Sequence, residues 1–375
     1  MRIASLFFCL SALVSFPLGA MAVDGVIEIN DNRAVAGSVT PGDTGGYPVS
    51  ITVAGSYRLT SDLSGIIAVS SGVGPVEIDL NGFTVDGGGQ VGSGINGALA
   101  GAGMVVRNGV VRNFTVSCVR VGDEGRVDRV LTEDCQTGIS TGVHSIVTRS
   151  HARDHTLNGV SAGIGSRVSS TVTEGNTGDG VQAGARSVTS QTLTRGNNSA
   201  GLDLGSESVS FGNVVAGNGV GIALDSRSVA DGNTIGSSAG GGLSAGDDVV
   251  LVRNNASDND AAAGILCNGR CVVKGNLAAN NTGIGIGVDD GANVVANTSS
   301  NNTLQGFSCS GGSEICHFVG NTAIANGGSG LVLDAASLTG SYKDNTFNSN
   351  SGSDVNQTGR DPGFLNNCSG TVPCP

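Results

Sequence analysis

Two aspartates, one histidine and one arginine are the residues of this chain whose types and spacing could do chemistry on a sugar. Asp179 and Asp203 lie 24 residues apart, and glycoside hydrolysis needs two carboxyl groups about 5–9.5 Å apart. Arg153 and His155 lie in a short cluster with Asp154, where an imidazole beside a carboxylate could move a proton near neutral pH. These four residues are the catalytic candidates. The alternative interpretation is structural: solvated aspartates on an acidic surface, and a hydrogen-bonded histidine in a turn.

A repeat of about 21 residues positions these candidates. Its marker is a glycine followed by an apolar residue, and the glycines are Gly138, Gly159, Gly180, Gly201, Gly221, Gly242, Gly264, Gly285, Gly306 and Gly330. After each glycine, apolar and polar residues alternate as in Val181-Gln182-Ala183 and Leu202-Asp203-Leu204. This alternation is typical of a strand with one face packed inward and one face in water. The predicted outward positions are Ser140, Ser161, Gln182, Asp203, Ala223 and Ser244.

A second strand is predicted about 13 residues before each of these, for example at 167–169, and an asparagine-rich turn joins the two. One series of turn asparagines comprises Asn233, Asn255, Asn276, Asn297, Asn321 and Asn345, and the other comprises Asn176, Asn197, Asn281, Asn302, Asn326 and Asn350. Glycine and asparagine are poor helix formers, and no helical period of 3.6 residues is present.

Short strands and repeated asparagines at a period of about 21 residues predict an all-β fold, a right-handed parallel β-helix. Each turn of chain would stack on the previous one at the strand spacing of about 4.8 Å. Asparagine at one turn position would form a ladder along the axis, which satisfies polar groups at a crowded corner. His155 aligns with Asn176 and Asn197, so it could belong to that ladder.

Three N-terminal segments carry a resemblance to a known group of proteins. They are 55–63 (GSYRLTSDL), 78–87 (IDLNGFTVDG) and 106–114 (VRNGVVRNF). The chain resembles exported bacterial right-handed β-helix repeat proteins of the pectate-lyase-like superfamily. The resemblance implies the fold over nearly all of the chain after its first segment, and it assigns no reaction, because a fold does not fix a function.

The predicted organisation has four parts. Residues 1–22 contain Arg2, an apolar run and Ala20-Met21-Ala22, which is typical of a cleavable secretory signal peptide. Residues 23–64 are predicted to form an N-terminal cap with the first strands, including a short helix near 27–36. The β-helix would occupy 65–360. Residues 361–375 would form a disulfide-closed C-terminal cap, because the ends of an open solenoid expose strand edges and core.

Eight of the nine cysteines lie beyond the predicted signal peptide. An exported chain meets an oxidising compartment, so disulfides are expected and a zinc site is not. Short spacings favour nearest-neighbour pairs, which are Cys118–Cys135, Cys267–Cys271, Cys309–Cys316 and Cys368–Cys374.

Charge limits the partners of the protein. The formal net charge is −12, and no run of basic residues occurs. Nucleic acid and anionic membranes bind clustered Lys and Arg, so neither is an expected partner. No later apolar run is long enough for membrane insertion. We expect a monomer in the periplasm or outside the cell, with a polysaccharide or cell-envelope glycan as its partner.

No known catalytic motif settles the activity. The polygalacturonase pattern of N-T-D, D-D, G-H-G and R-I-K is absent. In place of N-T-D the chain has N-T-G-D at 176–179, with an extra glycine, and in place of D-D it has Ala200-Gly201. Neither G-H-G nor R-I-K occurs. If the protein is an enzyme, it is a polysaccharide lyase, epimerase or glycoside hydrolase. The alternative is a non-catalytic structural or adhesive solenoid of the cell envelope.

Acidic pairs fall in predicted turns at Asp247-Asp248, at Asp258 with Asp260, and at Asp289-Asp290. Ca²⁺ takes six to eight oxygen ligands, which stacked turns could supply. The alternative is a solvated acidic corner, and no cofactor is expected.

Overall fold

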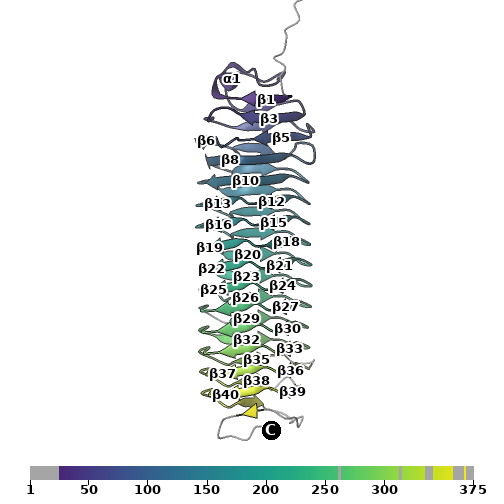
Figure 1. The fold of residues 1–375 in the computed structure, drawn as a ribbon, viewed down its shortest axis with the longest axis vertical. Helices are drawn as coiled ribbons and strands as arrows, with labels where there is room; N and C mark the ends of the chain where they lie inside the picture. The colour runs from purple at the N-terminus through teal and green to yellow at the C-terminus, as the bar shows by residue number, and fades with distance from the viewer. Residues whose placement is uncertain (1–24, 261–262, 312–314, 334–340, 358–366, 369–375) are drawn as a thin grey trace, which may run out of the picture.

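The computed structural model describes residues 25–260, 263–311, 315–333, 341–357 and 367–368. The chain coils into a long column of stacked turns, with its N-terminal and C-terminal turns at opposite ends (Figure 1). Strands of successive turns pair in parallel, as β14 (Val160–Ala162) does with β17 (Val181–Ala183). This confirms the predicted parallel β-solenoid.

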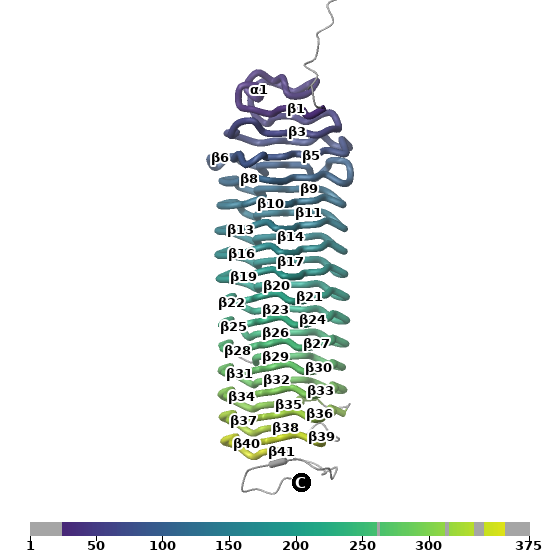
Figure 2. Tube along the Cα trace, viewed as in Figure 1, coloured from purple at the N-terminus to yellow at the C-terminus, as the bar shows by residue number. Residues whose placement is uncertain are grey.

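One strand of every turn belongs to a 15-stranded sheet, whose members follow one another down the column (Figure 2). Besides β14 and β17 these are β2 (Val49–Ile51), β4 (Ile67–Val69), β7 (Ile95–Gly97), β9 (Ser117–Val121), β11 (Thr137–Thr141), β20 (Ala200–Leu204), β23 (Val220–Leu224), β26 (Leu243–Ala245), β29 (Ala263–Cys267), β32 (Ile284–Val288), β35 (Phe307–Cys309), β38 (Leu331–Leu333) and β41 (Val355–Gln357).

The remaining strands form a 27-stranded sheet made of two columns. The first column contains β1 (Val26–Ile29), β3 (Gly55–Leu59), β5 (Val76–Asp79), β12 (Ile146–Thr148), β15 (Arg167–Ser169), β18 (Val188–Ser190), β21 (Val209–Phe211), β24 (Val229–Asp231), β27 (Val250–Val252), β30 (Val272–Lys274), β33 (Asn293–Val295), β36 (His317–Val319) and β39 (Ser341–Lys343). The second contains β6 (Thr84–Gln90), β13 (His151–Arg153), β16 (Val172–Glu174), β19 (Leu193–Arg195), β22 (Val214–Ala216), β25 (Thr234–Gly236), β28 (Asn255–Ser257), β31 (Leu277–Ala279), β34 (Thr298–Ser300), β37 (Thr322–Ile324), β40 (Thr346–Asn348) and β42 (Asn367–Cys368). Two long strands, β8 (Val105–Phe114) and β10 (Arg126–Glu133), span both columns.

A regular turn therefore has three strands, where the sequence predicted two. Two residues separate the first strand from the second, and the first of the two is in the left-handed conformation, for example Ser170 (φ 51°), Gln191 (φ 52°) or Gly212 (φ 61°). The left-handed residue varies in type from turn to turn. From Asn213 onward an asparagine follows it, and these asparagines were assigned from the sequence to the turn that joins two strands, so the bend between the first and second strands was not recognised.

The interior of the column is filled by stacked apolar side chains. In the 15-stranded sheet, strand pairing aligns one inward position whose residues are all buried: Val160, Val181, Leu202, Ile222, Leu243, Ile265 and Ile286. The repeated glycine is required by close packing: a Cβ on Gly201 would lie 2.5 Å from Val215 Cγ1 and 2.6 Å from Thr194 Oγ1. A larger residue there would force neighbouring turns apart.

Polar ladders line all three corners of the column. Between the second column and the 15-stranded sheet, the backbone N–H of Asn176 and of Asn197 each donates to the side-chain oxygen of the asparagine one turn on, at 3.1 Å. Asparagines at the bend repeat this pattern over Asn213, Asn233, Asn254, Asn276, Asn297, Asn321 and Asn345. Serines Ser145, Ser166, Ser187, Ser208 and Ser228 form the third ladder. The predicted member Asn255 was wrong by one residue: Asn254 is in the ladder and Asn255 begins β28.

The N-terminal end carries the only helix within the described residues, α1 (Asp31–Ala36). The Asn30 side chain accepts the Arg33 N–H and caps its start, and Gly37 ends it with φ 67°. This helix is shorter than the predicted 27–36, because strand β1 pairs with β3 and takes the first residues. It is neither long nor apolar enough to cross a membrane.

Three of the four predicted disulfides are present: Cys118–Cys135, Cys267–Cys271 and Cys309–Cys316. The signal peptide, most of the C-terminal cap and Cys374 lie outside the described residues, so the signal peptide, the cap and the Cys368–Cys374 pair remain predictions.

The register can be tested with adjacent substitutions in β23. Ile222 is fully buried, whereas Ala223 occupies a partly exposed position on the outer face. Replacing Ile222 by Asn should lower the free energy of unfolding by about 3 kcal/mol, because it buries an amide without partners and removes apolar contacts. Ala223→Asn should change it by less than about 0.5 kcal/mol. Equal losses in denaturant unfolding would contradict the register.

Candidate functional site

The outer face of the 15-stranded sheet carries a continuous column of small and polar side chains. Strand pairing aligns the residues of this outer column, which are Ser140, Ser161, Gln182, Asp203, Ala223 and Ser244. They are the positions predicted to face outward. Parallel strands repeat at about 4.8 Å, so the column offers regularly spaced groups to a long ligand.

Asp203 is the acidic residue of this column. Partial burial raises the pKa of its carboxyl, the negative charge of Asp179 raises it further, and Asp225 adds to the effect. A hydrogen bond from Gln182 opposes the shift without reversing it. A carboxyl group with a raised pKa keeps its proton to higher pH than an ordinary aspartate, which suits it to donate that proton.

Asp179 lies in the turn before β17 and is nearly buried. Its carboxylate oxygen Oδ1 accepts the backbone N–H of Ala200 at 2.9 Å, and its own N–H donates to Asn158 Oδ1 at 2.9 Å. Asp179 therefore ties three successive turns together, and its charge acts on Asp203 as well. The structure places the two predicted aspartates in one electrostatic cluster.

Asn158 extends this cluster and was not among the sequence candidates. Its Nδ2 donates to Gln182 Oε1 at 3.1 Å, which leaves the Gln182 amide N–H group to bond Asp203. The signal that could have found it is its repeat position, since Asn158 precedes Gly159 as Asp179 precedes Gly180.

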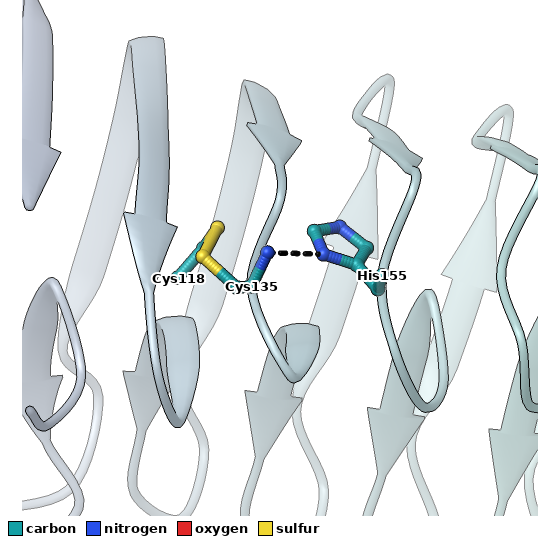
Figure 3. A group of neighbouring side chains, drawn as sticks. All are labelled: Cys118, Cys135 and His155. Carbon is teal, nitrogen blue, oxygen red and sulfur yellow. Dashed lines mark hydrogen bonds between the residues drawn. A yellow bond between two sulfur atoms is a disulfide. The ribbon is translucent and has the colours of Figure 1, made fainter. Parts of the chain in front are cut away.

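His155 is buried inside the column, in the turn after β13. Its Nδ1 accepts the backbone N–H of Cys135 at 3.1 Å, as Figure 3 shows. A backbone N–H can only donate, so the ring proton must lie on Nε2, which is 3.1 Å from Thr132 Oγ1. Burial lowers the pKa of the imidazole to about 4. His155 thus occupies a position of the asparagine ladder, because its backbone N–H donates to Asn176 Oδ1.

Arg153 ends β13 of the other, 27-stranded sheet. It belongs to an ion-pair column in which acid and base alternate on successive turns: Asp86, Arg112, Glu133, Arg153, Glu174 and Arg195. Arg153 pairs with Glu133, Arg195 with Glu174, and Arg112 Nε lies 2.8 Å from Asp86 Oδ2. The structure does not bring Arg153 or His155 to the outer column, so the four candidates do not converge. Their catalytic roles remain predictions.

Some of the acidic turn residues considered for calcium have other partners. Asp248 Oδ1 lies 2.9 Å from Arg270 Nε, and Asp289 Oδ1 accepts the Ser310 hydroxyl at 2.7 Å. Calcium binding at these turns remains an untested alternative.

Comparisons with known proteins agree with the fold. Residues 225–369 match the family described as "right handed beta helix region". No curated protein sequence shows significant similarity to the chain. Among solved structures, the Dettilon tailspike protein is 17% identical with a TM-score of 0.42, and the match covers 68% of this chain and 62% of the tailspike. This chain thus spans less than two thirds of the tailspike.

Two further solved structures are similar at the same level. A double mutant of the periplasmic alginate epimerase AlgG is 14% identical with a TM-score of 0.47, covering 78% of this chain and 77% of the epimerase. The GH87 alpha-1,3-glucanase from Streptomyces thermodiastaticus is 14% identical with a TM-score of 0.43, covering 81% of this chain and 63% of the glucanase. The family match identifies residues 225–369 as a right-handed β-helix region, and the stacked parallel strands continue the same solenoid through the rest of the described chain.

Proposed function

We propose that the protein binds polysaccharide along the outer column of the 15-stranded sheet, and that Asp203 supplies a proton to the bound glycan. The observation that carries the proposal is the environment of Asp203. This carboxyl lies on an outward strand position, its pKa is raised, and it is flanked by Asp179 and Asp225. Pairs of carboxyl groups with separated pKa values are the usual proton donors and acceptors of glycoside hydrolysis.

Charge defines the class of glycan. Asp179, Asp203 and Asp225 lie on successive turns, and Arg227 and Arg270 at the next corner are paired with Glu207 and Asp248. A polymer of uronic acids would meet net repulsion at the turns around Asp203, whereas exposed Arg120 lies four turns away on the same face. The face therefore suits a neutral or amino-sugar polysaccharide, with Gln182 and Asn158 as hydrogen-bonding groups for hydroxyls.

In a hydrolytic reaction the protonated Asp203 would donate to the glycosidic oxygen as its bond to carbon breaks. An ionised neighbour would stabilise the sugar cation or activate a water molecule. Asp179 keeps one carboxylate oxygen free of the Ala200 N–H bond, and Asp225 is exposed on the following turn. Either carboxylate could fill the second role.

The test is binding and degradation of neutral, amino-sugar and uronate polysaccharides by the protein, read as retained ligand and as new reducing ends. We expect neutral or amino-sugar polymers to bind and uronates to be rejected at low salt. Absence of binding to every polymer would contradict the proposal and favour the non-catalytic envelope solenoid.

Substitution of Asp203 tests the proton donor. Asp203→Asn should reduce turnover by about 100-fold or more, the usual contribution of a general acid, while glycan binding persists. Wild-type activity should fall as pH rises through the raised pKa of Asp203, because the carboxyl then loses the proton it donates. Asp258→Asn is the matched control, since Asp258 is exposed and its left-handed backbone (φ 57°) accepts asparagine. Equal activity of both variants would remove Asp203 from the reaction.

A further inference from the structure

Two cysteines and a histidine from three consecutive turns meet inside the column (Figure 3). Cys118 lies in β9, Cys135 follows β10, and His155 follows β13. Their sulfur and ring nitrogen atoms all lie within 4.8 Å of one another, and all three side chains are buried. In the oxidised protein the two sulfurs form a disulfide, so they offer no thiolate.

A surface depression reaches Cys135 of this cluster. It has a volume of about 260 Å³ and is lined by Phe114, Thr115, Asp134, Cys135, Gln136, Asp154 and Thr156. The carboxylates of Asp134 and Asp154 are exposed at successive turns. They place negative charge at the entrance, which attracts a cation from solution.

We propose that reduction of the Cys118–Cys135 disulfide turns this cluster into a binding site for a thiophilic divalent cation such as Zn²⁺. A dithiol would supply the two electrons: its own sulfurs become a disulfide, and Cys118 and Cys135 become thiols. Binding of the cation then displaces one proton from each thiol. The ligands are the two sulfurs and a ring nitrogen of His155. If that nitrogen is Nδ1, it exchanges the Cys135 backbone N–H, which it now accepts, for the metal.

The geometry of the cluster fits such an ion. Tetrahedral zinc holds sulfur at about 2.3 Å and nitrogen at about 2.0–2.1 Å, so neighbouring ligand atoms lie about 3.3–3.8 Å apart. The present separations, all within 4.8 Å, are close to this range. The Cα atoms of Cys118 and Cys135 are 5.6 Å apart, and the backbone is held by the flanking parallel strands. Two thiolates and an imidazole select Zn²⁺ or Co²⁺ over Ca²⁺ and Mg²⁺, which require oxygen ligands.

The bound cation would replace the lost covalent link. The disulfide joins two neighbouring turns, whereas the metal would also hold the third turn through His155. Solvent from the depression supplies the fourth ligand. This role is independent of the glycan site, because none of the three residues lies on the outer column.

The test is titration of the full chain with Co²⁺ after reduction by a phosphine, read by absorption. We expect one equivalent to give the intense d–d bands and the sulfur-to-metal charge-transfer band of tetrahedral cobalt with thiolate ligands, and Zn²⁺ to displace it. Oxidised protein should give neither band. Zn²⁺ should also raise the Tm of the reduced protein.

Three variants assign the ligands. Cys118→Ser with Cys135→Ser should abolish the charge-transfer band, and Cys267→Ser with Cys271→Ser should leave it unchanged. His155→Asn keeps both thiols and the ladder hydrogen bonds, and it should weaken cobalt affinity at least tenfold and shift the d–d bands. An unchanged spectrum and affinity in His155→Asn would overturn the proposal. A reduced wild-type protein that shows neither the bands nor a Zn²⁺-dependent rise in Tm would also overturn it, whether or not its circular dichroism is native.

Discussion

Asn197→Asp is expected to lower the free energy of unfolding by about 3–5 kcal/mol, the usual cost of an uncompensated buried charge. Asn197 is 1% exposed, and its Nδ2 donates to Asn218 Oδ1 at 2.8 Å and to the Thr173 carbonyl at 3.4 Å. An aspartate has no proton to donate at neutral pH, so it would turn a negative oxygen toward two acceptors. Urea unfolding followed by circular dichroism measures the loss.

The adjacent residue provides the matched control. Asn198 is exposed, so Asn198→Asp makes the same chemical change in contact with water and should alter stability by less than about 0.5 kcal/mol. If both variants unfold at the same urea concentration, the ladder does not stabilise the solenoid in the way the structure indicates.

His155→Asn is expected to remove about 3 kcal/mol of pH dependence from the stability of the disulfide-intact protein. The pKa of His155 is about 4 in the folded chain and 6.5 as its ordinary value. Between these values the unfolded chain binds the proton and the folded chain does not. The stability is therefore complete above pH 6.5 and is lost as pH falls toward 4, by about 1.4 kcal/mol for each unit of pKa difference.

Asparagine is the informative replacement because it occupies the equivalent place in the following turns. Its side-chain oxygen can accept the Cys135 N–H, as Asn176 accepts that of His155. The measurement is the urea midpoint of wild type and variant from pH 7 to pH 4. Glu133 and His151 also face the imidazole electrostatically, so only the difference between the proteins isolates His155. His144→Asn, at an exposed side chain, should keep the wild-type slope, and an equal slope in all three proteins would contradict the prediction.

Much of the fold was predictable because close packing between turns limits which residue types can occupy each repeat position. The glycine at each turn is required where a Cβ would strike the next turn, as at Gly201. After this glycine, apolar and polar residues alternate, which distinguishes side chains that face the interior from those that face outward. The predicted positions were correct for Asp203, which faces outward, and for Ile222, which faces the interior. The third strand of each turn was missed because the left-handed residue at its bend varies in type, as Ser170 and Gln191 show. The asparagines that follow this residue from Asn213 onward were assigned to the turn that joins two strands.

The candidate site was harder to predict because sequence order does not separate the inside of a turn from its outside at the corners. Arg153 and His155 are two residues apart, yet one side chain pairs with Glu133 on a surface and the other lies in the buried ladder. Asp179 seemed a surface residue from its spacing. Its burial follows from the bond to the Ala200 N–H one turn away, which only the stacked structure supplies.

One interruption in the ladders has a mechanical consequence. Ser238 takes the place of an asparagine between Asn218 and Asn259, and its buried hydroxyl has no hydrogen-bond partner. In a stack where each turn touches only its neighbours, strength under load is set by the weakest junction rather than by the average one. The serine and bend ladders still cross the plane between the turns of Asn218 and Ser238. A solenoid pulled along its axis should therefore open at this plane before it opens at the preceding junction, where all three ladder contacts are present.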